Sequence, residues 1–382
     1  MQANWREIAK AFNENHNYVL ATIIETRGAT YQKAGAMMLI NEQGDCFGLL
    51  SGGCLEADIS LHAKQVLLHK QSQVISYDLS VDADLLWGLG LGCDGAIDIL
   101  LQPLLLTNNH LGFCHLLGNI KAQQSGYYLQ KLPSEVSPKS SKKMPQNATT
   151  EYKNNAEPFA EFVLSETIDY SKIKTVSKSL QQGKSLVVTP IKPPINLLVC
   201  GAGPDVVPVA KFAEQMGWQV TLWDHRKSHL HERSFDSYQR RCVRAKDTNV
   251  DDYGGFDAAI VMTHNLTMDG EYLAKLIATS AIELSYIGLL GPQSRRDKLL
   301  SVCDVELSQA QHRVHGPIGL NLGGRGAEAI ALSIISEIQQ HFYTHLSTKQ
   351  NCEQSVICSV NDVEIINAKT KSIEIKSGVE YA

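Results

Sequence analysis

The stretch LLVCGAGPDVVPVAKFAEQMGWQVTLWDHR, residues 197–226, decides the fold of the second half of the chain. Its apolar runs and helical spacing predict a strand, a glycine turn, a helix and a second strand. Gly201 and Gly203 directly follow the first strand, where glycine permits a tight turn and a close approach of the backbone to a phosphate. Asp224 ends the second strand about twenty residues later, where a carboxylate can accept hydrogen bonds from a ribose.

Two residues depart from the full dinucleotide-binding pattern. Val206 stands in place of the third glycine, and Pro204 removes an N–H donor from the turn. We therefore predict a Rossmann-type domain that binds a nucleotide, with the alternative that the glycines serve packing alone. Arg226 suits either a 2′-phosphate or an ion pair with Asp224, so the sequence leaves NAD and NADP open.

Strands and helices alternate through the rest of this half, which predicts a doubly wound parallel sheet with helices on both faces. The pattern indicates strands at 258–262 and 286–290, and helices at 206–216, 270–279, 295–302 and 326–341. His264 follows the strand at 258–262, and loops at the carboxyl ends of parallel strands face the ligand crevice. His264 is therefore a candidate acid–base group or hydrogen-bond donor there, with a plain surface residue as the alternative.

The first half predicts a mixed α+β domain over residues 1–107. The pattern indicates a buried strand at 18–25, a hairpin at 36–50, a helix from near Cys54 to His69, and further strands at 74–79 and 96–101. Residues 108–192 are predicted to be a connector with a flexible insertion at 133–158, which is rich in Ser, Lys, Asn and Pro. The Rossmann-type domain then spans 193–346, and a tail spans 347–382.

The composition excludes several classes of protein. The chain has 382 residues, 35 basic against 40 acidic side chains and a net charge of −5, which argues against nucleic acid as a partner. Its longest apolar runs are too short to span a bilayer, so we expect no membrane association and a cytoplasmic location. The nine cysteines include no C-x-x-C pair, so neither a zinc ribbon nor another metal site is expected.

Several motifs, in order along the chain, resemble the XdhC/CoxI family. In the first half these are SGGCLEADI at 51–59 and GLGCDGAIDILLQPL at 90–104. In the second half they are CGAGPD at 200–205, MTHN at 262–265, YIGLLG at 286–291 and GPIGLNLGGRGAEAIALSIISEI at 316–338. Members of that family help to mature molybdenum hydroxylases such as xanthine dehydrogenase and carbon monoxide dehydrogenase.

The resemblance implies an accessory protein that binds the molybdenum cofactor (molybdopterin) and assists its sulfuration and its insertion into a molybdenum hydroxylase such as xanthine dehydrogenase. It also implies a cysteine desulfurase as a further partner, and we expect a homodimer. Such a protein is a maturation chaperone more than a catalyst. The alternative hypothesis is an NAD(P)-dependent oxidoreductase that uses Gly201, Gly203, Asp224 and His264.

The residues around Cys54 fit the first hypothesis. Gly52 and Gly53 precede a predicted helix, whose N-terminal N–H groups can hold a phosphate. A thiol at that position is favoured as thiolate and could contact molybdenum or carry sulfur, while Glu56 in the first turn suits the helix dipole. We therefore assign Cys54 and Glu56 as candidate catalytic residues, against an inert thiol in a tight turn. Cys93, in a second glycine-rich loop, is a further candidate cofactor-binding thiol.

Overall fold

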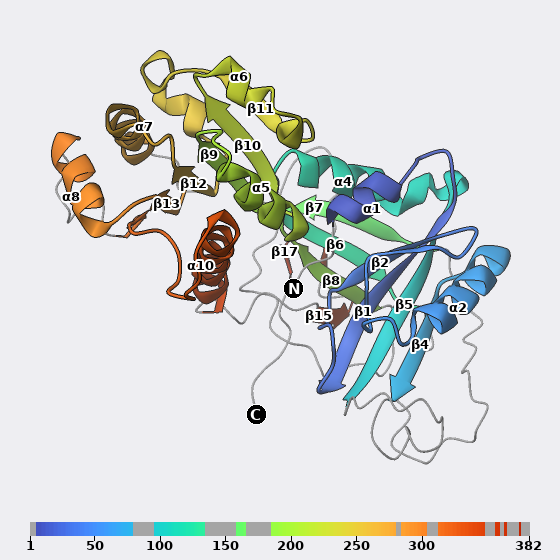
Figure 1. The fold of residues 1–382 in the computed structure, drawn as a ribbon. Helices are drawn as coiled ribbons and strands as arrows, with labels where there is room; N and C mark the ends of the chain where they lie inside the picture. The colour runs from blue at the N-terminus through green and yellow to red at the C-terminus, as the bar shows by residue number, and fades with distance from the viewer. Residues whose placement is uncertain are drawn as a thin grey trace. The chain divides into compact units, whose positions relative to one another are not determined.

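The computed structural model describes residues 5–78, 95–133, 158–165, 185–279, 284–303 and 312–347, together with short strands at 356–359, 363–364 and 374–375. The chain divides into two compact units (Figure 1). Unit 1 comprises Met1–Pro193 with Asn351–Ala382, and unit 2 comprises Pro194–Gln350.

Unit 1 is built on an antiparallel sheet in the order β3-β2-β1-β5-β4. Its strands are β1 (Tyr18–Gly28), β2 (Met37–Asn41), β3 (Cys46–Phe47), β4 (Gln73–Asp78) and β5 (Gly95–Leu104). The register places Tyr18 opposite Asn41 and Leu104, and Gly28 opposite Gly95. The sheet thus has two ends that are referred to below: the Tyr18 end, where β1 starts, and the Gly28 end, where β1 finishes.

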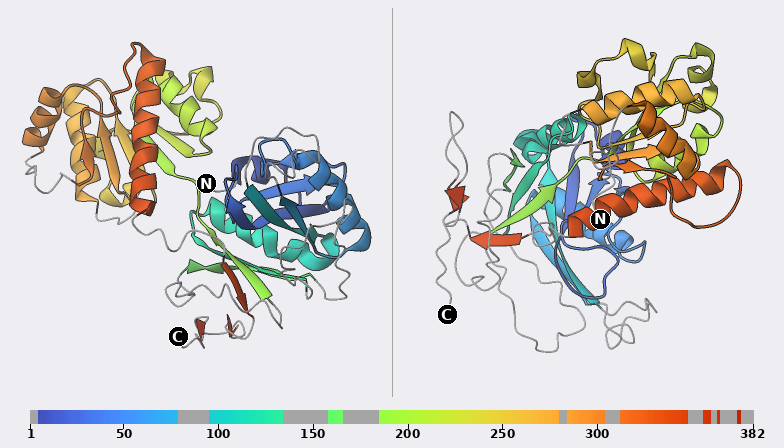
Figure 2. Two further views of the ribbon diagram at one scale, coloured as in Figure 1. Left: turned by 90° about the horizontal axis from the view of Figure 1, so that it is seen from below. Right: turned by 90° about the vertical axis from the view of Figure 1, so that its left-hand side faces the viewer.

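One face of this sheet is covered by helix α2 (Glu56–His69), which buries Ile59, Ala63 and Val66 against the strands. The other face packs against α1 (Trp5–Ala11), α4 (Phe113–Lys121) and a second antiparallel sheet. That sheet has the order β15-β8-β6-β7 and consists of β6 (Gly126–Lys131), β7 (Ala160–Leu164), β8 (Ser185–Ile191) and β15 (Val356–Ser359) (Figure 2). The described residues between 108 and 191 thus supply much of this face's cover.

Unit 2 is a doubly wound α/β unit with a wholly parallel sheet in the order β11-β10-β9-β12-β13-β14. Its strands are β9 (Asn196–Cys200), β10 (Gln219–Asp224), β11 (Gln239–Cys242), β12 (Ala258–Val261), β13 (Tyr286–Leu289) and β14 (Val314–His315). In chain order this is 3-2-1-4-5-6, the strand order of the Rossmann fold. The predicted parallel, doubly wound sheet is confirmed.

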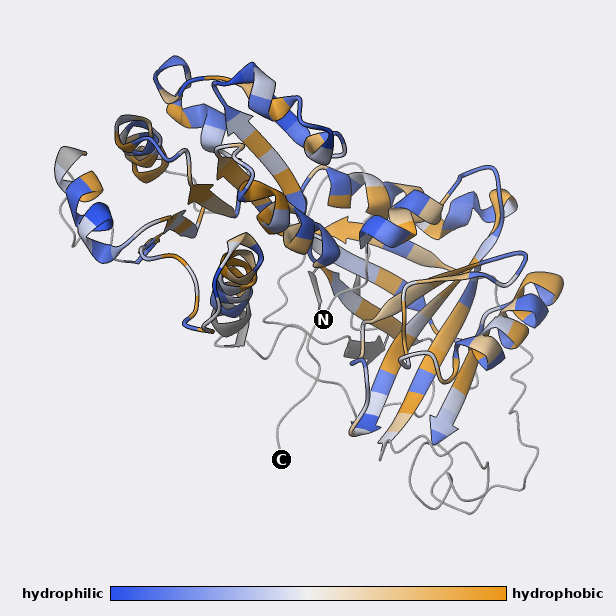
Figure 3. Ribbon diagram, viewed as in Figure 1, coloured by the Kyte–Doolittle hydropathy of each residue, from blue (hydrophilic) through white to orange (hydrophobic). Residues whose placement is uncertain are grey.

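Alternate residues of β9 face opposite layers of helices, as the strand period requires. Leu197 and Val199 pack with α5 (Val206–Gln215) and α10 (Ala327–Ser347), and Leu198 and Cys200 pack with α7 (Leu266–Ala278) and α8 (Gln293–Val302). Figure 3 shows the apolar colouring of the central strands β9 and β12.

The remaining short elements are α6 (Lys227–Leu230), η1 (Leu106–Gly112), η4 (Arg233–Phe235), η5 (Ala245–Asp247), η6 (Val250–Tyr253), β16 (Val363–Glu364) and β17 (Glu374–Ile375).

The structure differs from the sequence pattern at a few boundaries. Helix α2 begins at Glu56, two residues after Cys54. Helix α7 begins at Leu266, four residues before the predicted start, because the side chain of Asn265 accepts a hydrogen bond from the Met268 N–H. The edge strand β11 gives no apolar signal because all four of its residues are exposed. The predicted insertion falls almost entirely outside the described residues. Among the helices of the described residues, none combines the length and the apolar character needed to cross a bilayer.

Candidate functional site

The predicted site around Cys54 lies at the Gly28 end of the unit 1 sheet. Strand β1 ends there and β2 begins there, so the segment 29–36 joins them at this end. Strand β3 runs toward the same end, so the segment 48–55 that leads into α2 also lies here; we call it the SGGC loop. Asp78 and Gly95, where β4 ends and β5 begins, are at this end as well. The predicted cofactor residue Cys93 lies outside the described residues.

The SGGC loop depends on two glycines with left-handed backbone angles. Gly52 has φ +78° and Gly53 has φ +103°, a region that residues with a side chain rarely adopt. A Cβ on Gly52 would lie 3.3 Å from the ring of Tyr31, whereas a Cβ on Gly53 would meet open space. The N–H groups of Gly52 and Gly53 donate no backbone hydrogen bond within the described chain. The loop therefore offers two free donors beside an exposed aromatic ring.

The carboxylate of Glu56 holds the SGGC loop from inside. Its Oε1 accepts hydrogen bonds from the N–H groups of Leu50 at 3.0 Å and Ser51 at 2.8 Å. Its Oε2 accepts one from the Ser51 hydroxyl at 2.5 Å and one from the Leu55 N–H at 3.2 Å. Burial raises the pKa of Glu56, but the hydrogen bonds from Ser51 and Leu50 outweigh it and hold this pKa below its ordinary value. A catalytic role for Glu56 stays a prediction.

Cys54 is exposed and lies two residues before α2 begins, with Leu55 as the N-cap residue between them. The segment 29–36 at the same end of the sheet carries Lys33, which is exposed and donates a long hydrogen bond of 3.4 Å to the Thr30 hydroxyl. Within the described part of the chain, no group of three or more His, Cys, Asp or Glu side chains could hold a metal ion. This end of the sheet thus carries a thiol, free N–H donors, an aromatic ring and, on the segment 29–36, a cation.

The predicted nucleotide site lies in unit 2, between β9 and β12, where the strand order changes direction. Gly201 has φ +132°, and a Cβ there would lie 2.5 Å from the carbonyl oxygen of Met262, which directly follows the neighbouring strand β12. His264, with φ +62°, reaches across from the β12 side, and its Nε2 lies 2.8 Å from an oxygen of Asp205. A pair of side chains of this protein thus links the two sides of the crevice next to Gly203.

Asp224 is not available to a ribose in this arrangement. Its carboxylate is 1% exposed and accepts hydrogen bonds from the Ala202 N–H, the Arg226 N–H and two nitrogens of the Arg226 guanidinium, at 2.7 to 3.0 Å. Burial raises the pKa of Asp224, and the bonds from Arg226 outweigh burial and lower it. Arg226 therefore pairs with Asp224, one of the two roles that the sequence leaves open.

The turn itself also fits a dinucleotide poorly. Pro204 has no N–H to offer, and Asp205 places a negative charge at the N-cap of α5, where a pyrophosphate would have to lie. The tight approach of Gly201 to Met262 shows what that glycine does in this unit, because only glycine fits there. Packing, the alternative to nucleotide binding, accounts for Gly201, and the residues of the crevice do not fit NAD or NADP.

The sequence pattern does not reveal how Asp269 joins two loops of this crevice. Asp269 is 2% exposed and accepts hydrogen bonds from the N–H and hydroxyl of Thr263 and, at 2.6 Å, from the Arg295 guanidinium. In the structure Arg295 is thus an internal partner of Asp269. The sequence holds one hint of this contact: Asp269 lies in the first turn of α7 and Arg295 in the first turn of α8, and both helices follow neighbouring parallel strands.

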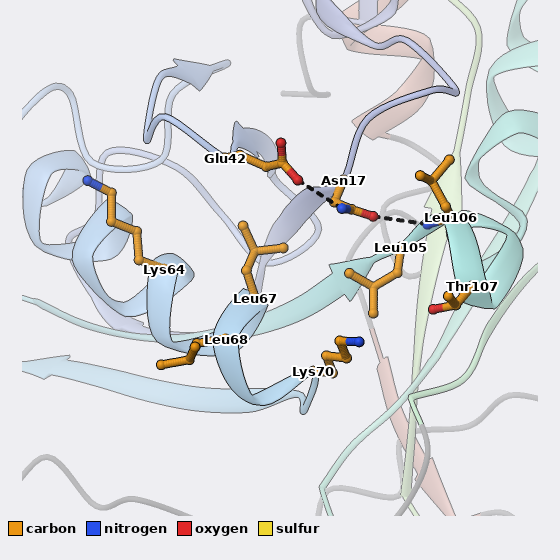
Figure 4. A pocket seen from close by; sticks show the side chains of 9 residues that line it. All are labelled: Asn17, Glu42, Lys64, Leu67, Leu68, Lys70, Leu105, Leu106 and Thr107. Atoms are coloured by element: carbon orange, nitrogen blue, oxygen red, sulfur yellow. Dashed lines mark hydrogen bonds between the residues drawn. The ribbon is translucent and has the colours of Figure 1, made fainter.

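A separate surface groove lies at the other end of the unit 1 sheet (Figure 4). It has a volume of about 470 Å³, and the last turns of α2 line it with Lys64, Leu67 and Leu68. Across the groove, Asn17 donates a hydrogen bond to Glu42 and accepts one from the Leu106 N–H. The groove is therefore distinct from the SGGC loop, which precedes the first turn of the same helix.

Comparisons with known proteins match both halves of the chain. The description "XdhC and CoxI family" fits residues 11–78, and "XdhC Rossmann domain" fits residues 197–338. The chain is 29% identical over 328 residues to a protein of Bacillus subtilis described as a probable subunit of xanthine dehydrogenase, and the match covers 84% of this chain and 92% of that protein. It is 30% identical over 112 residues to the molybdenum cofactor insertion chaperone PaoD of Escherichia coli, covering 28% of this chain and 34% of PaoD.

A solved structure from Bacillus halodurans, described as a xanthine dehydrogenase, has the same fold over most of its length. Its TM-score is 0.69 at 27% identity, over 90% of this chain and 96% of that one. The two family descriptions, in their expected order, together cover more than half of the residues of this chain. The protein belongs to the XdhC/CoxI family.

Proposed function

We propose that this protein is a maturation factor that binds the molybdenum cofactor and delivers it to a molybdenum hydroxylase such as xanthine dehydrogenase. The similarity to PaoD and to the Bacillus subtilis protein supports the cofactor and the class of partner. The observation that carries the proposal in this chain is the SGGC loop, which presents an exposed Cys54 beside the free N–H groups of Gly52 and Gly53.

The chemistry of this loop fits the chemistry of a molybdopterin. Free N–H groups in a glycine turn suit its phosphate, and the exposed ring of Tyr31 against Gly52 suits a flat heteroaromatic ring. A thiol such as that of Cys54 is a soft ligand that suits molybdenum, and exposed Lys33 adds a positive charge for an anionic molecule. When bound, the cofactor supplies the molybdenum centre that the target enzyme uses.

The finer parts of the proposal rest on the family resemblance. They are assistance in sulfuration of the cofactor, a cysteine desulfurase as the source of the sulfur, and a homodimer as the assembled state. The oxidoreductase alternative is not proposed, because Asp224 and Asp205 leave the unit 2 crevice unsuited to a dinucleotide.

Pterin analysis of the purified protein tests the proposal. The protein is produced in a host that makes molybdenum cofactor, oxidised under heat, and assayed for the fluorescent pterin product. We expect pterin with the wild type, little or none with Cys54→Ser, and the wild-type amount with Cys242→Ser. Cys242 is the matched control because it is also an exposed thiol but lies in unit 2. Wild-type protein without pterin would contradict the proposal.

A further inference from the structure

Glu56 combines four hydrogen bonds on one half-buried carboxylate, and all four come from the SGGC loop that precedes it. Three donors are backbone N–H groups, of Leu50, Ser51 and Leu55, and the fourth is the Ser51 hydroxyl. Hydrogen bonds to an ionised acceptor are about twice as strong as neutral ones. Each oxygen of the carboxylate accepts two hydrogen bonds, so all four of its acceptor positions are occupied by donors of the loop and none is left for a substrate.

Ser51 closes the arrangement into a ring of contacts. Its Oγ donates to Glu56 at 2.5 Å and accepts a hydrogen bond from the Leu55 N–H at 2.8 Å. The two ends of the turn, Ser51 and Leu55, are therefore held to the same carboxylate. Between them lie Gly52, Gly53 and Cys54, which donate none of these four hydrogen bonds.

The two consecutive glycines explain why such a clamp matters. Glycine loses more conformational freedom on ordering than any other residue, so a Gly-Gly turn is costly to hold in one conformation. Gly53 has nothing within 4 Å of the place where its Cβ would be, and Cys54 is exposed, so the tip of the loop has few packing contacts of its own. The fixed ends supplied by Glu56, together with the Tyr31 ring against Gly52, constrain where the tip points.

We infer that Glu56 is the positioning residue of the SGGC loop, because it fixes the ends of the turn and so sets how Cys54 presents its thiol and how Gly52 and Gly53 present their N–H groups. This inference deepens the proposed function, since it concerns the same loop, and it replaces the candidate catalytic role of Glu56. The carboxylate acts through Cys54 and takes no part in contact with the cofactor.

The test follows the thiol of Cys54 in the full chain without cofactor. Iodoacetamide labelling is quantified for the peptide that contains Cys54, by mass spectrometry, across pH 6 to 9. The variants are Glu56→Ala, Glu56→Gln and Ser51→Ala, and the reference is the free peptide SGGCLEADI. Asp58→Asn is the matched control, because Asp58 is also an acid in the first turn of α2 but accepts a hydrogen bond from the Tyr77 hydroxyl and none from the loop.

We expect the labelling rate and pH profile of Cys54 in Glu56→Ala to move to those of the free peptide. Glu56→Gln should move part of the way, because its amide oxygen can still accept from the Leu50 and Ser51 N–H groups. Ser51→Ala should lie between, and Asp58→Asn should match the wild type. Amide hydrogen exchange of segment 48–56 should quicken at least tenfold in Glu56→Ala, while exchange in β1 and β5 stays unchanged and shows that the sheet is folded. A wild-type labelling profile for Cys54 in both Glu56 variants, with that sheet intact, would overturn the inference.

The same preparations separate this inference from the proposed function. Labelling and hydrogen exchange need no bound cofactor, so they test the clamp even in protein that carries no pterin. Pterin content tests the proposed function, whatever the state of the clamp. Normal pterin with an unchanged Cys54 profile in Glu56→Ala refutes the clamp alone.

Discussion

Replacing Asp269 by asparagine removes the charge that joins the loop after β12 to the helix after β13. The carboxylate is buried at 2% exposure and holds Thr263 by two hydrogen bonds and Arg295 by one of 2.6 Å. An amide of the same shape keeps one oxygen for Thr263 but turns an N–H group toward the guanidinium or loses that contact. The variant therefore leaves Arg295 without its anionic partner.

The loss of unfolding free energy in Asp269→Asn depends on how far Arg295 is buried. Removing one partner of a fully buried ion pair costs about 3–5 kcal/mol, because the remaining charge loses its compensation. The Arg295 side chain is 27% exposed and can regain part of its hydration, which favours a value near the lower end, about 3 kcal/mol. With a urea m-value of about 2–3 kcal/mol/M for a unit of this size, the midpoint falls by about 1 M.

The assay is urea unfolding followed by tryptophan fluorescence, with Trp218 and Trp223 reporting on the core of unit 2. Because Trp5 in unit 1 also contributes to the fluorescence, hydrogen exchange of peptides from unit 2 is used to show that the unfolding step that has moved is that of unit 2. The control is Asp297→Asn, which removes a carboxylate that pairs with the Arg296 guanidinium but is itself 52% exposed. That control should change stability by less than about 0.5 kcal/mol. Equal effects of the two substitutions would refute the reasoning.

Three further predictions concern the crevice of unit 2 and the SGGC loop. The lowered pKa of Asp224 means that its pairing with Arg226 stabilises the fold above the ordinary aspartate pKa of about 4 and is lost as pH falls through the lower folded value. Thermal unfolding of Asp224→Asn should therefore show a reduced melting temperature at pH 7 and a smaller loss on going from pH 5 to pH 3 than the wild type. Gly201→Ala should destabilise the protein by about 2–3 kcal/mol, because its Cβ would lie 2.5 Å from the Met262 carbonyl oxygen. Gly53→Ala adds only the strain of its backbone angle and should cost about 1–2 kcal/mol. Urea unfolding that ranks the two substitutions in the reverse order would contradict this. Thermal-shift titration with NAD(H) and NADP(H) should leave the melting temperature unchanged, and a saturable rise would contradict the conclusion that the crevice does not fit a dinucleotide.

Local patterns were enough to predict most of unit 2. Strands such as β9 and β12 are short apolar runs buried on both sides, and the glycine turn at Gly201 fixes the order of strand and helix. The pattern failed at β11, because an edge strand with exposed residues has no hydrophobic signature. It also failed for α4, whose apolar residues pack beneath a sheet built partly from distant segments.

For the candidate site, the sequence predicts the nearby helix start but not the contacts made there. The sequence places Cys54 and Glu56 beside a helix start, yet it cannot show that the carboxylate turns back to bond Leu50 and Ser51. In the same way, the distance between Asp224 and Arg226 in the sequence allows an ion pair or two free ligands, and only the fold decides between them. Roles that depend on which way a side chain turns therefore need the three-dimensional contacts.

The face of the unit 1 sheet that packs against α1, α4 and the second sheet matters for any shortened form of the protein. Tyr18, Leu20 and Leu39 of that face are buried by Phe113 and Tyr128, which lie beyond residue 107. A shortened protein that stops at residue 107 would leave this apolar face open to water. Such a face attracts other copies of itself, so the shortened protein should precipitate or form aggregates, and a well-behaved N-terminal piece has to run on through β8 to residue 191.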